Sequence, residues 1–370
     1  MCIRDSDYYV LIAASKENNP DLFSYDDAMN SEHRSEWIRA AIKEIQALEK
    51  FGCWEEIPLH EATTKVLPGT WVFKVKRAPD GTFKKFKARY CIRGDLQEGE
   101  FETYAPVVQF SSVRLFLAWS LMMNWYTCSI DFSNAFIQAE LNDPTYIHLP
   151  RGFSGSGTKK SCLRLKRSLY GLAVAPRLWY QHLWKALQEL GLKASKHDPC
   201  LLMRKDLIII CYVDDLGIQA PNKKIVDELI SQLQERGFGL TLEGSFSEYL
   251  GIQYTKLSNG SIKMSQAGLI KKILDATDMN DCNSNRTPST KEALPSDDNG
   301  PPMEEPWSYR SVVGMLLYLA TNTRPDIAYA VNKLAKFSNN PGIIHFRSLL
   351  HLIDYLKNTS TKGLRFFSNY

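Results

Sequence analysis

Two adjacent carboxylates, Asp214 and Asp215, follow the apolar run Leu207-Ile208-Ile209-Ile210-Cys211 and the aromatic Tyr212. A run of this kind indicates a buried strand that ends in a turn. Burying unpaired charge is costly, so a divalent cation at the strand end is one interpretation of the pair. A solvated Asp-Asp turn without chemistry is the other, because acidic residues favour turns in any case. The tetrapeptide Tyr212-Val213-Asp214-Asp215 alone leaves both interpretations open.

A third carboxylate, Asp131, ends the short strand predicted over residues 127–132. If that strand lies beside the Asp214–Asp215 hairpin, three carboxylates converge and repel one another unless cations lie between them. Two Mg²⁺ ions about 3.5–4 Å apart suit such a site and catalyse in-line displacement at phosphorus. Phosphoryl transfer asks a protein mainly for positioning and charge neutralisation. The three acids therefore predict metal-dependent phosphoryl transfer.

Basic residues gather in two places although the formal net charge of the chain is only +4. Patches of this kind suit polyanions such as nucleic acid or a triphosphate, and a solvated charged face is the alternative for either patch alone. The first patch, between residues 74 and 93, holds Lys74, Lys76, Arg77, Lys84, Lys85, Lys87, Arg89 and Arg93, and the second holds Lys159, Lys160, Arg164, Lys166 and Arg167.

The length of 370 residues and an ordinary apolar and charged composition predict two or three globular units. No run of about 18 apolar residues occurs, so a membrane-spanning helix is not expected. The eight cysteines are scattered without a Cys-x-x-Cys pair, which argues against zinc and favours reduced thiols in an intracellular compartment.

The periodicities predict an α+β fold with an antiparallel sheet that carries the acids. Residues 35–48 form an amphipathic helix with Ile38, Ile42, Ile45 and Leu48 on its apolar stripe. Strands 71–76 and 83–92 form a basic hairpin, residues 133–140 are helical, and Pro176 opens a helix that ends at Gly191. Helices are also expected at 225–236, 266–277 and, as two or three, at 309–357. Further strands are expected at 207–213, 216–219, 249–257 and 261–265, and the last residues, 363–370, look like the first strand of a further domain.

Ten short motifs, in this order and spacing, resemble the reverse transcriptases of copia-type long-terminal-repeat retrotransposons. The resemblance runs from about residue 26 to the end of the chain. Its motifs are Trp71-Val72-Phe73-Lys74-Val75-Lys76, Lys87-Ala88-Arg89, Thr103-Tyr104-Ala105-Pro106-Val107-Val108, Asp131-Phe132-Ser133-Asn134-Ala135-Phe136, Ser168-Leu169-Tyr170-Gly171-Leu172, Ala175-Pro176-Arg177-Leu178-Trp179-Tyr180, Tyr212-Val213-Asp214-Asp215, Tyr249-Leu250-Gly251-Ile252, Tyr309-Arg310-Ser311-Val312-Val313-Gly314 and Thr323-Arg324-Pro325-Asp326-Ile327.

This resemblance implies an RNA-directed DNA polymerase of the fingers-palm-thumb type with an antiparallel palm sheet. The implied partners are an RNA template, a DNA primer/template, dNTPs and other parts of the element's polyprotein, with no membrane. The implied cofactor is a pair of Mg²⁺ ions, for which Mn²⁺ can substitute, and the implied location is a cytoplasmic particle or the nucleus. We expect a disordered leader over 1–24, the polymerase over 25–282, a linker over 283–307, and a helical connection region over 308–370 leading to a truncated ribonuclease H domain.

The resemblance also assigns roles to single residues. Asp131, Asp214 and Asp215 are the catalytic metal ligands, helped by the Phe132 carbonyl. Phe136 is the gate against a 2′-hydroxyl, and a core position in its helix is the alternative. The dNTP site further includes Lys76, Lys87, Arg89, Tyr170 and Gly171, and the choice between Lys87 and Arg89 as the triphosphate grip stays open. The primer and template contacts are Tyr212, Tyr249, Leu250 and Gly251, where a simple sheet edge is the alternative.

One departure from the family pattern concerns activity. The family carries Lys-Gln where this chain has Ala173-Val174, which removes a cation and an amide near the substrate. A degenerate relic that binds nucleic acid without polymerising is therefore the alternative function. A different two-metal enzyme on a similar palm, such as a nucleotidyl cyclase, is a third, which the long fingers hairpin and the Tyr249 hairpin disfavour.

Overall fold

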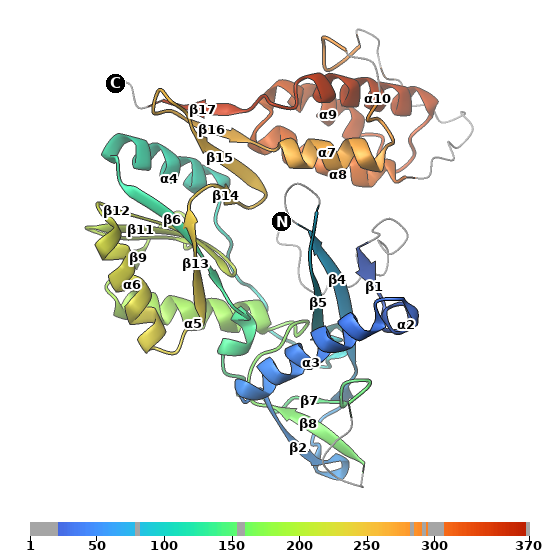
Figure 1. The fold of residues 1–370 in the computed structure, drawn as a ribbon, viewed down its shortest axis with the longest axis vertical. Helices are drawn as coiled ribbons and strands as arrows, with labels where there is room; N and C mark the ends of the chain where they lie inside the picture. Colours follow the sequence, from blue (N-terminus) through green and yellow to red (C-terminus); the bar gives the residue numbers. More distant parts are fainter. Residues whose placement is uncertain are drawn as a thin grey trace. The chain divides into compact units, whose positions relative to one another are not determined.

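The structure, a computed structural model, describes residues 21–77, 82–153, 160–281, 285–290, 294 and 307–367. The chain forms two compact units (Figure 1). The first comprises Met1–Gln109 and Cys128–Gly244, and the second comprises Phe110–Thr127 and Ser245–Tyr370. Within the described residues no helix is both long and apolar enough to cross a membrane. The six cysteines that the structure describes are buried free thiols.

The basic hairpin is present in the first unit as β4 (Gly69–Arg77) and β5 (Phe83–Ile92), which form a three-stranded sheet with β1 (Leu22–Phe23). Helix α2 (Tyr25–Asn30) precedes α3 (Arg34–Lys50), which covers one face of this sheet. The ring of Trp37 on α3 lies 5.4 Å from that of Phe73 and 4.5 Å from that of Phe86. Strand β1 begins inside the predicted leader, whose residues 1–20 lie outside the described residues.

The predicted apolar stripe of α3 was wrong in part. Ile38 and Ile42 are 37% and 41% exposed, whereas the buried face runs through Trp37, Ala41, Glu44, Ile45 and Leu48. The predicted and the observed sets of residues both fit a helical period of 3.6 residues. The observed set faces the hairpin because it buries the large ring of Trp37.

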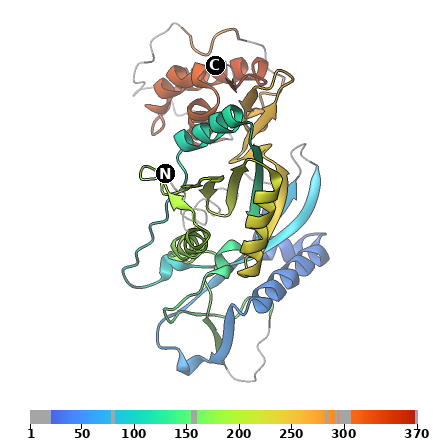
Figure 2. The same cartoon turned by 90° about the vertical axis from the view of Figure 1, so that its left-hand side faces the viewer.

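A six-stranded antiparallel sheet in the first unit carries the predicted acids. Its order is β13-β6-β12-β11-β10-β9, so β6 lies directly beside β12. Helices α5 (Ala175–Glu189) and α6 (Lys223–Glu235) pack beside the sheet (Figure 2). The predicted α+β class is confirmed. In the order of the sheet, the strands are β13 (Leu240–Ser245), β6 (Tyr126–Phe132), β12 (Asp215–Ala220), β11 (Leu207–Tyr212), β10 (Leu201–Arg204) and β9 (Lys193–Ala194).

A smaller four-stranded sheet completes the first unit, with the order β2-β8-β7-β3. Strands β3 and β7 pair in parallel, and the other neighbours are antiparallel. The strands are β2 (Trp54–Pro58), β8 (Ser161–Leu165), β7 (Tyr146–Ile147) and β3 (Val66–Leu67), and one-turn 3₁₀ segments lie at Leu59–Glu61 and Gly94–Leu96.

The second unit combines helix α4 (Phe110–Met123) with a four-stranded sheet and a helical core. The sheet order is β14 (Glu248–Tyr249), β15 (Ile252–Lys256), β16 (Ile262–Ser265) and β17 (Leu364–Phe366). The helices are α7 (Ala267–Ala276), α8 (Tyr309–Asn322), α9 (Ala328–Ala335) and α10 (Ile343–Asn358), with a 3₁₀ turn at Pro325–Ile327. Apolar side chains of all four helices, including Ile273, Leu316, Leu334 and Leu352, form one buried cluster.

One expectation for this region differs from the structure. The strand expected over 249–257 is interrupted by a turn at Leu250 and Gly251, whose φ angles are +54° and +68°. Strand β17 pairs with β16 in the sheet of the second unit. Helix α7, which precedes the predicted linker over 283–307, shares a buried core with the helices that follow, and most of that linker lies outside the described residues.

Candidate active site

Asp131 and Asp214 come together at adjoining strand ends in the first unit. Asp131 is the sixth residue of β6, and Asp214 lies in the turn that joins β11 to β12, the strand beside β6. The backbone N–H of Phe132 donates to the Asp214 carbonyl oxygen at 3.1 Å. Burial raises the pKa of Asp131, and the nearby charges of Asp214 and Glu243 raise this pKa further. Two acidic residues that are distant in the sequence thus lie close together in a half-buried position.

The turn that carries Asp214 is strained. Tyr212 pairs with Asp215 across the hairpin, which leaves Val213 and Asp214 as the two turn residues. Val213 has a φ of +54°, a conformation that β-branched residues rarely adopt. Its carbonyl oxygen accepts a 2.7 Å hydrogen bond from Nε1 of Trp179 on α5. The Trp179 ring packs 5.0 Å from that of Phe132, so one buried side chain supports both strand ends.

Cations on one face of the β4–β5 hairpin approach these acids. Val72 pairs with Arg89, Lys74 with Lys87 and Lys76 with Lys85, and residues directly opposite on antiparallel strands share a face. Burial, followed by the charges of Arg89 and Lys76, lowers the pKa of Lys87 to about 8. The charges of Lys87 and Arg89 offset part of the rise in the pKa of Asp131. The negative charge of Asp214 favours the charged forms of Lys76 and Arg89 and so acts to raise the pKa of each.

Arg89 is held differently from the lysines. Its guanidinium carbon lies 4.6 Å from the ring centroid of Tyr170, a cation–π contact, and its Nε is buried without a hydrogen-bond partner. A buried guanidinium N–H without a partner is costly, and an oxygen of an incoming anion would satisfy it. This unsatisfied donor and the ring contact distinguish Arg89 from Lys87, whose ammonium is a point charge.

Phe136 extends this stack of rings. It is 5% exposed, and its ring makes an edge contact with Tyr170 at 5.1 Å. Its segment is a single 3₁₀ turn, Ala135–Gln138, where the sequence predicted a helix over 133–140. Asn134, the residue before this turn, has a φ of +55°, a left-handed conformation that does not fit a right-handed α-helix over 133–140. The geometry agrees with both a gate and a packed core position for Phe136.

Gly171 allows two backbone segments to cross next to Tyr170. It has a φ of +92°, and a Cβ at this position would overlap the carbonyl oxygen of Ile92 at the end of β5. The Ile92 N–H donates to the Tyr170 carbonyl at 2.7 Å across the same crossing. Only glycine fits at this close approach of two backbone segments. The same approach fixes the position of Tyr170 next to the hairpin that carries Arg89.

Three other predicted site residues, Tyr249, Leu250 and Gly251, belong to the second unit, where the Tyr318 hydroxyl donates to the Leu250 carbonyl at 2.7 Å. Asp215 opens β12 opposite Tyr212. In the part of the chain that the structure describes, no three Asp, Glu, His or Cys side chains gather closely enough to hold a metal ion. The pair Asp131–Asp214 is therefore observed, and the convergence of three carboxylates is not.

Two positioning residues were missed by sequence reasoning. Gln138, 4% exposed, donates from Nε2 to the carbonyls of Ser133 and Gly239 and accepts the Gly239 N–H, which clips the Phe136 turn to the chain before β13. Glu44 on α3 is a buried carboxylate near Arg89 and Lys87, and burial raises its pKa. The only sequence signal for these two residues is a glutamine or a glutamate among apolar neighbours, and that pattern does not show whether the polar side chain is buried or exposed.

Comparison with known proteins decides the family. The family described as reverse transcriptase (RNA-dependent DNA polymerase) matches residues 54–291 of the chain. The chain belongs to the reverse transcriptase family. The match includes the acids, the basic hairpin and the Tyr170–Gly171 crossing, so the copia-type resemblance expected from the motifs is confirmed.

Proteins similar to this chain include plant transposon proteins. The retrovirus-related Pol polyprotein from transposon RE1 of Arabidopsis thaliana is 30% identical over 89% of this chain and 23% of its own length. The Pol polyprotein from transposon TNT 1-94 of Nicotiana tabacum is 28% identical over 97% of this chain and 28% of its own. The chain thus spans about a quarter of the polyproteins that it matches.

A solved foamy viral protease-reverse transcriptase in complex with double-stranded DNA also resembles the chain, at 15% identity and a TM-score of 0.49. The match covers 88% of this chain and 48% of the viral one.

The donor set at the strand ends suits Mg²⁺. Carboxylate and carbonyl oxygens are the hard ligands that this ion prefers, and polymerase-type sites bind it through one or two carboxylates together with substrate phosphates. Asp131, Asp214 and the Phe132 carbonyl supply such oxygens. The chemistry of these oxygens fits a divalent metal ion of this kind.

Proposed function

We propose that this chain extends a primer on an RNA or DNA template by adding dNTPs to the primer 3′-hydroxyl. The observation that carries the proposal is the meeting of Asp131 and Asp214 beneath a cationic hairpin face in a member of the reverse transcriptase family. In the reaction the primer 3′-oxygen bonds to the α-phosphorus, the bond from that phosphorus to the bridging oxygen breaks, and pyrophosphate leaves.

Mg²⁺ bound at the acid pair supplies charge neutralisation and a more acidic primer hydroxyl. Asp131 and Asp214 hold this charge beside the strand ends, and the short Phe132–Asp214 backbone contact keeps their spacing constant. Asp215 is proposed as a further ligand on the resemblance alone. Lys76, Lys87 and Arg89 bind the triphosphate and compensate its negative charge while the leaving group departs.

Phe136 is proposed to exclude ribonucleotides. Its ring is locked by Tyr170, which in turn is locked by Arg89, so the aromatic surface cannot move aside without disturbing the triphosphate grip. A rigid ring of this kind discriminates against an added 2′-hydroxyl by steric overlap. The proposed template and primer contacts at Tyr212 and at Tyr249–Gly251 rest on the resemblance.

Primer extension tests the proposal. The whole chain is incubated with a primed RNA template, dNTPs and Mg²⁺, and product length is measured alongside binding of the primed template. We expect extension by the wild type, none by Asp214→Asn, and normal extension by Asp227→Asn, which removes an exposed carboxylate paired with Lys223 on α6. Salt-sensitive binding without incorporation in Mg²⁺ or Mn²⁺ would favour the non-catalytic relic instead.

A further inference from the structure

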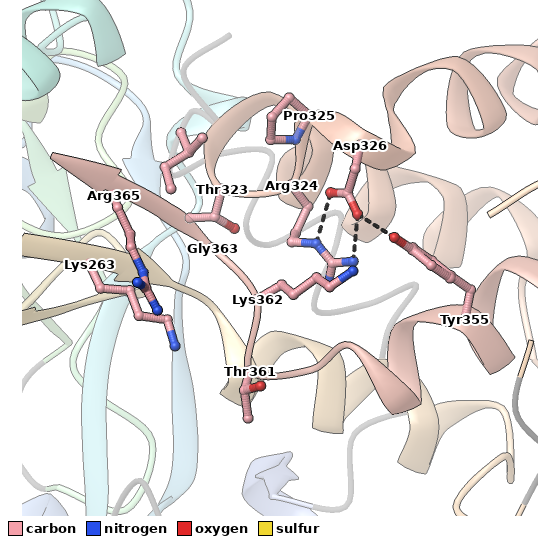
Figure 3. A pocket seen from close by; sticks show the side chains of 11 residues that line it. Lys263, Thr323, Arg324, Pro325, Asp326, Tyr355, Thr361, Lys362, Gly363 and Arg365 are labelled. Atoms are coloured by element: carbon pink, nitrogen blue, oxygen red, sulfur yellow. Dashed lines mark hydrogen bonds and ion pairs between the residues drawn. The ribbon is translucent and has the colours of Figure 1, made fainter. Parts of the chain in front are cut away.

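A basic cavity of about 500 Å³ lies within the second unit, and none of its lining residues is among the predicted site residues (Figure 3). Its wall is built from β16, β17, the Thr361–Gly363 segment before β17, and the segment Thr323–Asp326 before α9. The motif Thr323-Arg324-Pro325-Asp326 forms one side of this cavity.

Arg324 gives the cavity a rigid side. Its buried guanidinium donates to both carboxylate oxygens of Asp326, at 2.9 and 2.8 Å, and to the carbonyl and hydroxyl oxygens of Thr359 at the end of α10. Asp326 also accepts from the Tyr355 hydroxyl at 2.8 Å. The guanidinium of Arg324 is therefore paired within the protein, where it stabilises one wall of the cavity.

Three further cations line the cavity without such neutralisation. Lys263 on β16 and Arg365 on β17 are directly opposite in the antiparallel register, and Figure 3 shows their side chains extending together. Lys362 lies with its Nζ 5.6 Å from the Tyr355 ring centroid. Within the described residues none of the three forms an ion pair with a carboxylate.

Such an arrangement costs stability unless an anion is bound. Like charges directly opposite on neighbouring strands destabilise a sheet, and long basic side chains could separate into solvent if nothing held them together. The backbone also brings them close: Gly363 packs where a Cβ would overlap the Met264 carbonyl, which draws the Lys362–Arg365 segment onto β16. The paired cations Lys263 and Arg365, with Lys362 on the Tyr355 side of the cavity, an exposed hydroxyl at Thr361 and a volume larger than one phosphate suit a phosphorylated ligand.

We propose that Lys263 and Arg365 bind a phosphate group of a nucleic-acid backbone in this cavity, and that Lys362 adds positive charge from its Tyr355 side. The inference rests on the proposed polymerase function for the choice of nucleic acid as the source of the phosphate. Lys362 and Arg365 are exposed, so a bound phosphate stays accessible from solvent and can belong to a polymer whose neighbouring nucleotides continue outside the cavity. A free nucleotide or inorganic phosphate has the same chemistry and is separated from the polymer by the test.

The test compares the salt dependence of binding. A fluorescent primer–template duplex is titrated with the whole chain at several salt concentrations, for the wild type, the double variant Lys263→Gln/Arg365→Gln, and the control Lys336→Gln, an exposed lysine at the end of α9. We expect the double variant to bind roughly tenfold more weakly and its plot of log K against log salt to flatten by about 0.9, the loss of one phosphate contact. Lys336→Gln should match the wild type.

Two further readouts make the outcome decisive. The double variant should keep the wild-type rate of nucleotide addition at saturating duplex, whereas Asp214→Asn should lose that rate and keep the salt slope; a failure of the polymerase proposal is thereby distinguished from a failure of this one. A wild-type slope and affinity in the double variant would overturn the inference. So would inorganic phosphate or dNTP binding that is lost in the double variant while duplex binding is unchanged, because the site would then serve a free anion. A urea midpoint at or above the wild-type value confirms that the variant is folded.

Discussion

The backbone crossing at Gly171 yields a quantitative prediction. Gly171 and Gly237 lie in the same unit with similar φ angles, +92° and +87°, but a Cβ at Gly171 overlaps Ile92 whereas a Cβ at Gly237 meets nothing within 4 Å. Alanine at Gly237 costs about 1 kcal/mol of stability, the net penalty of a left-handed conformation. Alanine at Gly171 costs this and, in addition, about 1–3 kcal/mol for displacing packed backbone. We therefore expect Gly171→Ala to lose about 2–4 kcal/mol.

Urea unfolding of both variants measures this difference, and nucleotide-addition kinetics give its functional counterpart. Moving the Gly171 backbone displaces Tyr170 from Arg89, so KM for the dNTP should rise at least several-fold in Gly171→Ala and stay unchanged in Gly237→Ala. Equal losses of stability in the two variants, with equal KM values, would refute the assignment of Gly171 to a close backbone crossing next to the triphosphate grip.

Three other predictions follow from the site. The pKa of Lys87, about 8 against 10.5 for an ordinary lysine, means that its charge is lost as pH rises through 8; dNTP affinity should fall there, and Lys87→Arg should flatten that pH profile. Between those two values the unfolded chain binds the extra proton, so this lysine makes stability rise with pH, which urea midpoints can check. Phe136→Val should admit ribonucleotides more readily, and unchanged sugar discrimination in competition assays would leave the ring as core packing beside Tyr170. Trp179→Phe, which loses the hydrogen bond to Val213, should cost about 0.5–1.5 kcal/mol and slow nucleotide addition, whereas a wild-type urea midpoint and rate would show that the turn supports itself.

Sequence periodicity predicted the parts of the fold that depend on local pattern. The run 207–213 with its hairpin partner, the basic hairpin and the Pro176 helix were all confirmed, because alternation, turn residues and a helix-opening proline are local signals. The neighbouring positions of Asp131 and Asp214 required one further assumption, that β6 lies beside β12, which the sheet order confirms.

Long-range packing decided the rest. Glu44 is buried within the true stripe of α3 and accepts a hydrogen bond from the Tyr90 backbone, so a polarity pattern could not identify that face. The pairing of β17 with β16 joins residues about a hundred positions apart, which no local pattern encodes. Val213 and Leu250 adopt positive φ angles that their side chains disfavour, and such strain is maintained by tertiary contacts from Trp179 and Tyr318.

A double-mutant cycle at Asp131 and Asp214 tests the central claim most directly. The single-turnover rate of dNTP addition is measured for Asp131→Asn, Asp214→Asn and the double variant, with duplex binding as the control for folding. If the two carboxylates serve one shared cation site, each single change should slow addition by about 10³-fold, and the double variant should be no slower than the slower single variant. Losses that multiply in the double variant would show that the acids act independently and would contradict a shared site.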